Sequence, residues 1–229
     1  MKILLTGANG FVGKELRKHL SKQKNIHLNI STRSNPEKPI LGYNIYKINS
    51  IDKNTDWSPA LRKIEVVVHL AGRAHIMNEK KTTALNEYRK VNVDGSLNLA
   101  RQSISAGVKR FIYISSIKVN GESTELGRPF TAEDIPSPVD SYGISKLEAE
   151  KGLFKIISNS NMELVIIRPV LIYGKGAVGN FLSMMNWIAS GVPLPLKSIK
   201  NSRSFLGLDN LIDFITVCLN HPKARNEIF

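Results

Sequence analysis

A tyrosine and a lysine near the middle of the chain have the types and the spacing of an acid/base pair. Tyr142 and Lys146 lie four residues apart in a stretch, 141–158, whose pattern predicts a helix, so both side chains would share one helical face. An ammonium group beside a phenol favours the phenolate and lowers the pKa of the phenol, which gives a base that works near neutral pH. The same spacing is common on ordinary helix surfaces, so its significance depends on the surrounding residues.

Polar and small residues follow two apolar runs that read as buried strands. The first run, 66–70, leads into an Ala-Gly pair, and the second, 111–114, leads into two serines. Ligands bind at the carboxyl ends of the strands in open α/β sheets, so we expect both segments to lie beside the tyrosine and lysine. A long helix predicted over 82–106 adds a polar residue to the same set. The residues concerned are Ser116, Leu70, Ala71, Gly72 and Asn92.

A glycine-rich loop opens the chain between a short apolar strand, 3–5, and an amphipathic helix. Three glycines at this position suit a tight turn, a close approach of the backbone to a pyrophosphate, and close packing of the helix on the strand. The helix N-terminus offers its free N–H groups and the positive end of its dipole to phosphates. The strand–loop–helix context predicts a dinucleotide-binding site. Its expected contacts are Gly7, Asn9, Gly10, Phe11, Val12 and Gly13.

The end of the second predicted strand, 26–30, bears on which dinucleotide is bound. NAD-binding folds usually place a carboxylate there, which binds the ribose hydroxyls and repels a 2′-phosphate. This chain has Ser31 and Arg33 instead, and a guanidinium can pair with a 2′-phosphate. We therefore expect NAD or NADP as cofactor, with NADP favoured and use of both left open.

Apolar strands alternate with helices along most of the chain, which predicts a parallel sheet covered on both faces. The expected fold class is α/β, a doubly wound parallel sheet (Rossmann fold) with a partial, smaller C-terminal substrate-binding part. Glycines and prolines loosen the alternation after Pro169, so we place a boundary between a dinucleotide-binding domain, 1–173, and a substrate-binding region, 174–229. Helices are expected in the latter at 181–190 and 210–220. The predicted strands are 3–5, 26–30, 43–48, 66–70, 111–114 and 164–167.

Composition excludes several classes of protein. The net charge of +13 suggests nucleic-acid binding, but the basic residues are scattered and lack interleaved aromatic platforms, so we expect no nucleic-acid partner. No apolar run is long enough to cross a bilayer and no signal peptide precedes the glycine loop, so we expect no membrane span and a cytoplasmic location. The single cysteine, Cys218, allows neither a disulfide framework nor a zinc site, and no metal is expected.

Taken together, the glycine loop, the serine and the Tyr-x-x-x-Lys pair resemble the extended short-chain dehydrogenases/reductases, in particular the UDP-glucose 4-epimerase-like group of the NAD-dependent epimerase/dehydratase family. The resemblance implies that Tyr142 is the general acid/base for a sugar hydroxyl and that Lys146 binds the nicotinamide ribose and lowers the pKa of the tyrosine. It implies that Ser116 hydrogen-bonds the same sugar oxygen. Hydride would pass between the sugar carbon, usually C4, and the nicotinamide.

Later segments extend the resemblance to a nucleotide-sugar substrate. The run from Arg168-Pro169 to Tyr173-Gly174 matches the family pattern after the sixth strand. By the same resemblance, Asn180 and Arg203 would contact the diphosphate of the substrate. The helices over 82–106 and 141–158 would pair in a homodimer. Members of this family are longer chains, so the sugar-binding part here is expected to be partial.

One departure from the family pattern narrows the chemistry. Family dehydratases carry Asp-Glu after the catalytic Ser or Thr, whereas this chain has Ile117-Lys118, so dehydration is not expected. A nucleotide-sugar 4-epimerase and a 4-ketoreductase both remain. Lys118 either projects into the sugar pocket or is an ordinary exposed lysine. The alternative functions are a catalytically silent NAD(P)-binding sensor or scaffold, against which the intact Ser116, Tyr142 and Lys146 argue, and a nucleic-acid-binding protein.

Overall fold

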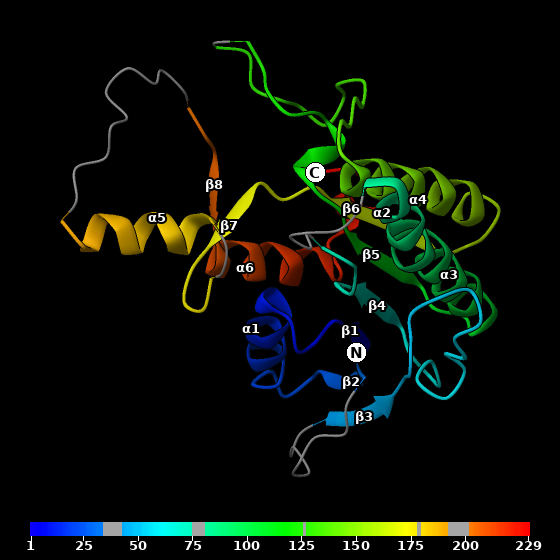
Figure 1. The fold of residues 1–229 in the computed structure, drawn as a ribbon. Coiled ribbons are helices and arrows are strands. Elements are labelled where there is room, and N and C mark those ends of the chain that lie inside the picture. Colours follow the sequence, from blue (N-terminus) through cyan, green and yellow to red (C-terminus); the bar gives the residue numbers. More distant parts are fainter. Residues whose placement is uncertain (34–42, 75–80, 126, 178–179, 192–201) are drawn as a thin grey trace.

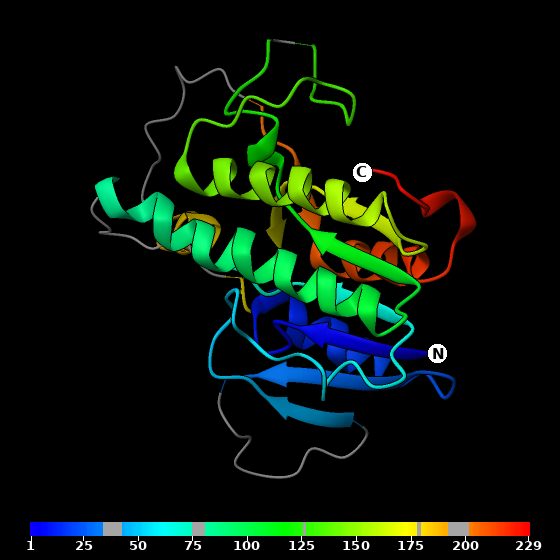
Figure 2. The same cartoon turned by 90° about the vertical axis from the view of Figure 1, so that its right-hand side faces the viewer.

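The described residues build a parallel sheet of six strands in the order β3-β2-β1-β4-β5-β6. The structure is a computed structural model, and it describes residues 1–33, 43–74, 81–125, 127–177, 180–191 and 202–229. Figure 2 shows the strands running side by side in one direction. This arrangement confirms the expected doubly wound α/β fold. The strands are β1 (Lys2–Thr6), β2 (His27–Thr32), β3 (Tyr43–Lys47), β4 (Val66–His69), β5 (Arg110–Ile114) and β6 (Glu163–Ile167).

Helices cover both faces of this sheet, which explains why its central strands are apolar throughout. Figure 1 shows α1 (Phe11–Leu20) and α6 (Leu208–Cys218) on one side and α2 (Lys81–Tyr88), α3 (Ser96–Ser105) and α4 (Ser141–Ile157) on the other. In α6 the residues at the i, i+3, i+4 and i+7 positions are buried against the sheet, the pattern of an amphipathic helix. These residues are Leu208, Leu211, Ile212 and Ile215.

The long helix expected over 82–106 differs from the prediction in one respect. Its middle forms a π-helix, η1 (Arg89–Gly95), between α2 and α3. π-turns inside helices are rare and are concentrated at functional sites. The expected cofactor contact Asn92 lies within it and is 1% exposed. At the end of η1, a Cβ on Gly95 would lie 2.6 Å from Ile51 Cγ2, so only glycine allows this close approach.

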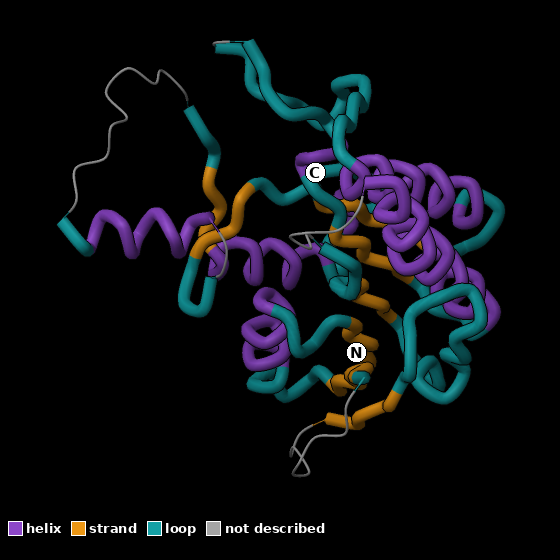
Figure 3. The backbone as a smooth tube through the Cα atoms, in the orientation of Figure 1, coloured by secondary structure: helices purple, strands orange, loops and turns teal. Residues whose placement is uncertain are grey.

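Residues after 170 form two further strands that the sequence did not suggest. In the described part of the chain, β7 (Leu171–Tyr173) pairs in parallel with β8 (Phe205–Gly207). The helix α5 (Asn180–Ala189) extends away from the main sheet beside this pair, as Figure 3 shows. By contrast, α6 packs in the same core as β1, so burial does not divide the chain at residue 174. The functional boundary proposed there stays a prediction.

The end of the chain pairs with the edge of the main sheet. Ile228 forms a parallel bridge with Ile166, and the Arg168 N–H donates to the Phe229 carbonyl at 2.7 Å. A 3-10 helix, η3 (Pro222–Ala224), leads into this segment. Among the described helices, none combines the length and the apolar character that a membrane span requires.

Candidate active site

The glycine loop packs so closely that side chains are excluded from two of its positions. Gly7 has a φ of +70°, and a Cβ there would lie 2.7 Å from the Ala71 nitrogen. At Gly13 a Cβ would lie 2.1 Å from the Gly7 carbonyl oxygen, so any side chain there would force the backbone to shift. The Gly10 N–H donates to the same Gly7 carbonyl at 2.9 Å. The three glycines therefore hold the start of α1 against the end of β1, as the sequence predicts for a pyrophosphate loop.

The N-terminus of α1 is open to an anion. Gly10 is its cap residue, no side chain caps it, and its first turn has no acidic residue. Its first N–H groups and the positive end of its dipole are therefore available to phosphate oxygens. Phe11 and Val12 are half-buried at the start of the helix. Asn9 is exposed, and its side-chain oxygen accepts a hydrogen bond from the Arg17 guanidinium at 3.2 Å.

A buried histidine joins the ends of β1 and β4. His69 Nδ1 lies 2.6 Å from the Thr6 hydroxyl, and Nε2 lies 2.9 Å from the Ser96 hydroxyl on α3. The Thr6 hydroxyl also accepts the Ala71 N–H at 3.2 Å, which fixes the segment Leu70–Gly72 beside the glycine loop. Burial lowers the pKa of His69 from 6.5 to about 3, helped by the charge of Lys146, so the ring is neutral. This role was not predicted from the sequence, although a histidine that ends a Val-Val-Val strand is a usable signal.

Asn92 connects the loop after β4 to α4. Its carboxamide accepts the Arg73 N–H at 2.8 Å and donates to the Arg73 carbonyl at 3.0 Å. It also donates to the Ser145 hydroxyl at 3.0 Å, and that hydroxyl donates to the Tyr142 carbonyl at 2.7 Å. The side-chain hydrogen bonds of Asn92, a predicted cofactor contact, therefore hold the loop after β4 and the helix α4 in place.

Lys146 is buried beside the carboxyl end of β5. Its ammonium donates to the Ile114 carbonyl at 2.6 Å and lies 4.1 Å from the centre of the Tyr113 ring. Burial lowers the pKa of Lys146 to about 7, while the nearby Glu150 carboxylate opposes the shift. The lysine therefore changes charge near neutral pH, which is typical of functional sites.

Tyr142 and Ser116 face each other where α4 begins. Burial raises the pKa of Tyr142 to about 12, a hydrogen bond with Ser116 lowers it, and Asp140 and Tyr88 raise it further. The Tyr142 and Tyr88 rings are 6.0 Å apart with an angle of 64° between them. The expected depression of the tyrosine pKa by Lys146 is therefore not seen in the protein alone, where burial is the largest cause of the shift. Ser116 Oγ accepts the Lys118 N–H at 3.2 Å, which leaves its own proton free to donate.

The register of the sheet explains why these residues converge. Thr6 pairs with His69, His69 pairs with Tyr113, and the neighbouring Ile114 pairs with Ile167. The loops that follow β1, β4, β5 and β6 therefore all leave the sheet where the carboxyl ends of its strands lie, and this end is called the catalytic edge. Below this edge Arg168 forms a buried ion pair with Glu150, at 2.6 Å, and donates to Asn120 at 3.2 Å. The sequence identifies Arg168 only as part of a family motif, and its partner Glu150 was not predicted.

The remaining predicted contacts lie further from the tyrosine. Ser31 is 4% exposed near the end of β2, and its hydroxyl has no hydrogen-bond partner among the described residues. Arg33 follows it and is exposed, as is Arg203 before β8. Lys118 lies next to the serine and is paired with carboxylates. Asn180 begins α5, and its side chain lies outside the described part of the structure.

Comparisons with known proteins agree with this geometry. The chain is 46% identical over 230 residues to a UDP-glucose 4-epimerase of Vibrio cholerae, covering 99% of this chain and 69% of the relative. It is 30% identical to an N-acetyl-alpha-D-glucosaminyl-diphospho-ditrans,octacis-undecaprenol 4-epimerase of Escherichia coli O157:H7, covering 99% and 66%. The chain thus spans about two thirds of these relatives.

A solved structure shares the fold, and a family model covers nearly the whole chain. The fold matches a UDP-glucuronic acid 4-epimerase from Bacillus cereus, in complex with NAD, with a TM-score of 0.84 and 24% identity, over 100% of this chain and 76% of that one. The sequence model of the NAD dependent epimerase/dehydratase family matches residues 3–229. The carboxyl ends of the strands bring together the glycine loop, Ser116, Tyr142 and Lys146, and the family model matches nearly the whole chain. The chain therefore belongs to the NAD dependent epimerase/dehydratase family.

Proposed function

We propose that this protein is an NAD(P)-dependent nucleotide-sugar 4-epimerase that acts on a UDP-sugar. The observation that carries the proposal is the convergence of Ser116, Tyr142 and Lys146 beside a glycine loop that excludes side chains. The 46% identity to a UDP-glucose 4-epimerase supports this substrate class. The tyrosine–lysine pair argues against a silent sensor, because a sensor needs only the cofactor loop.

The residues of the chain have separate parts in this reaction. Tyr142 takes the proton from the sugar hydroxyl and returns it after the keto sugar has rotated in the site. Ser116 donates a hydrogen bond to the same oxygen, since its acceptor side is occupied by the Lys118 N–H. The ammonium of Lys146 favours the phenolate when both groups face a bound ribose. A bound nicotinamide supplies the acceptor and donor of the hydride at the sugar carbon.

The cofactor is held by the groups at the carboxyl ends of β1 and β2. Gly7, Gly10 and Gly13 with the N-terminus of α1 hold the pyrophosphate, and Ser31 and Arg33 face the adenosine ribose. The absence of a carboxylate at Ser31–Arg33 favours NADP over NAD, because nothing there repels a 2′-phosphate. The same preference for NADP supports a second candidate function, a 4-ketoreductase. Such an enzyme must take up a fresh reduced cofactor in every turnover, whereas an epimerase retains its cofactor.

The substrate and the partner subunit are assigned to neighbouring elements. Arg203 and Asn180 bind the diphosphate of the nucleotide sugar, a role for which the planar guanidinium of arginine is suited. These residues lie in the region 174–229, which we propose as a partial sugar-binding part. The outer faces of α3 and α4 pair in a homodimer.

A product analysis tests these assignments. The purified chain is mixed with UDP-glucose and either NAD or NADP, and the sugar products and the nicotinamide absorbance are followed. Formation of UDP-galactose without a net change in absorbance supports the epimerase, and Tyr142→Phe should abolish it. Oxidation of NADPH by a 4-keto UDP-sugar supports the reductase. Binding of cofactor without turnover of any of these sugars would overturn both and leave the sensor.

A further inference from the structure

The lysine after the catalytic serine is held between two carboxylates. Lys118 lies in the 3-10 helix η2 (Ile117–Val119), and its ammonium is 2.5 Å from a Glu122 oxygen and 3.4 Å from Asp140 Oδ2. Its side chain is 31% exposed, so these ion pairs are partly shielded from solvent. Burial opposes the charge of Lys118, but the two carboxylates outweigh it and raise its pKa above the ordinary value. The lysine therefore stays positively charged wherever an enzyme of this type works.

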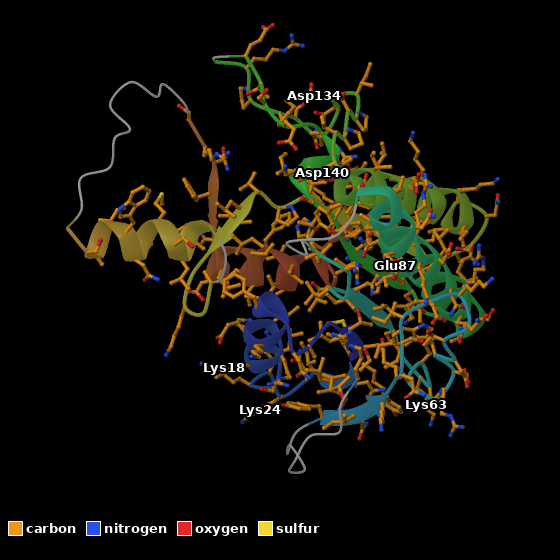
Figure 4. The ribbon with its side chains drawn as sticks, viewed as in Figure 1. Lys18, Lys24, Lys63, Glu87, Asp134 and Asp140 are labelled. Atoms are coloured by element: carbon orange, nitrogen blue, oxygen red, sulfur yellow. The ribbon has the colours of Figure 1, made fainter. Side chains whose placement is uncertain are left out.

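One of these carboxylates also caps the helix that carries the tyrosine. Asp140 Oδ1 accepts the Gly143 N–H at 2.6 Å, the bond that begins α4. A Cβ on Gly143 would lie 2.7 Å from the Lys118 carbonyl oxygen, so the serine turn and the helix touch through their backbones. Figure 4 labels Asp140 at this junction, with Asp134 in the loop above it. Lys118 and Asp140 thus connect the two elements that carry Ser116 and Tyr142.

We propose that Lys118 is a positioning residue for the proton transfer, which neutralises Asp140 and holds the Ser116 turn against α4 so that Tyr142 can carry a negative charge. The inference rests on the proposed acid/base role of Tyr142. It assigns to Lys118 a role other than contact with the sugar. It also explains why a lysine can occupy a position where a dehydratase needs a carboxylic acid.

The groups that act on the pKa of Tyr142 come from several elements, and the Asp140 carboxylate is the larger of the two adverse ones. Asp140, from the cap of α4, raises the pKa of Tyr142, and Tyr88 at the end of α2 does so to a smaller extent. The hydrogen bond with Ser116, from the turn after β5, lowers it.

Cations also approach from two sides. Lys146 lies one turn along α4, and the Arg73 guanidinium stacks 5.8 Å from the Tyr88 ring centre. Lys118, together with its second partner Glu122, faces the adverse carboxylate itself. Among the described residues, Lys118 is the cation in contact with Asp140.

The test is a pH profile of kcat for Lys118→Met. With Asp140 left unneutralised, the phenol is favoured over the phenolate, so the acidic limb of the profile should move to higher pH by about one unit. At pH 7 this corresponds to a roughly tenfold loss of kcat that is recovered at higher pH, with little change in KM. Lys118→Arg keeps the charge and should restore most of the profile.

A double variant isolates the electrostatic part. Asp140→Asn keeps a capping side chain but removes the charge, so in the Lys118→Met/Asp140→Asn variant the shift should disappear. Lys109→Met serves as the matched control, because Lys109 is also paired with a carboxylate, Glu65 at 3.8 Å, but lies before β5 at the opposite edge of the sheet. Its profile should equal that of the wild type.

Two kinetic results, and one spectroscopic result, would overturn the inference. A loss of kcat by the same factor at every pH, or a shift that persists with Asp140→Asn, assigns Lys118 a structural or substrate-contact role instead. A spectroscopic titration separates this failure from that of the proposed function: the phenolate absorbance of Tyr142, taken as the difference from Tyr142→Phe, needs no turnover. An unchanged midpoint in Lys118→Met rejects the positioning role, whatever sugar the enzyme uses.

Discussion

The catalytic edge of the main sheet and the projecting part after residue 170 are built in different ways. At the edge, backbone contacts exclude side chains at Gly7 and Gly13, and buried polar groups such as His69 are satisfied by partners within the protein. In β7, β8 and α5, large apolar side chains remain in solvent. These are Leu171, Tyr173, Leu182, Met185, Trp187, Ile188 and Phe205. The proposed cofactor half of the site is therefore organised by the buried core of the sheet, whereas the proposed sugar half has large apolar side chains in solvent.

The largest expected loss of stability comes from breaking the buried ion pair below the edge. Arg168→Met leaves the Glu150 carboxylate, whose side chain is 2% exposed, without its partner. We expect the free energy of unfolding in urea to fall by about 3–5 kcal/mol. Arg89→Met is the control, because it breaks a pair with Glu148 whose side chains are 43% and 33% exposed and should cost about 0.2–1 kcal/mol. Equal effects of the two variants would show that the edge is no more rigid than the surface.

A methyl group added in each region gives the next contrast. Gly13→Ala places its Cβ 2.1 Å from the Gly7 oxygen, so it should cost about 1–3 kcal/mol of stability and weaken NAD binding. Gly207→Ala, at the end of β8, has a φ of −63° and meets nothing closer than 3.6 Å, so its effect should stay within about 0.5 kcal/mol. Urea unfolding and cofactor titration measure both. A tolerated Gly13→Ala would contradict the steric account of the loop.

His69 makes the stability of the edge depend on pH. In the unfolded chain it binds a proton below about pH 6.5, but in the folded protein only near pH 3. The unfolded state therefore binds more protons across this window, and the contribution of His69 to the free energy of unfolding is full above pH 6.5 and is lost as the pH falls.

His69→Leu should remove this component and deprive the Thr6 and Ser96 hydroxyls of their histidine partner, at a cost of about 1–3 kcal/mol at pH 8. The difference between wild type and variant should shrink as the pH is lowered from 6.5 towards 3. Urea unfolding at a series of pH values measures it. A difference that is independent of pH would mean that the ring already carries a proton in the native state.

The smallest effect is expected in the projecting part. Trp187 on α5 is 48% exposed, so Trp187→Ser should change the free energy of unfolding by no more than about 0.5 kcal/mol. A thermal unfolding scan beside that of Gly13→Ala compares the two regions directly. A loss of several kcal/mol here would show that α5 is packed as firmly as the sheet edge.

The sequence predicted the main sheet well because its central strands are largely apolar on both faces and most of its strands are separated by helices. Val66–His69 and Glu163–Ile167 are examples, since their burial leaves a continuous signal. The glycine loop was equally predictable, because tight turns and close approaches admit few other residues. Convergence of Ser116 with Tyr142 and Lys146 followed from strand order and from the family resemblance.

Other features leave no such signal. The strands β7 and β8 have three residues each, too few to show the alternation of a strand. Their apolar side chains are exposed, but in the sequence they look the same as buried ones. Ion-pair partners far apart in the sequence, such as Arg168 and Glu150, are brought together only by the packing of α4 on β6. The raised pKa of Tyr142 reflects burial, which the spacing of Tyr142 and Lys146 does not reveal.

The π-helix η1 also limits how the length of this segment can change. A π-turn holds an additional residue compared with an α-turn, and a single deletion within Arg89–Gly95 would allow a regular α-helix to form across it. Such a deletion would remove the widened turn that directs the Asn92 side chain towards Arg73 and Ser145, even though α2 and α3 would keep their directions. We therefore expect insertions and deletions within η1 to disturb the site, whereas substitutions on its outer face should be tolerated.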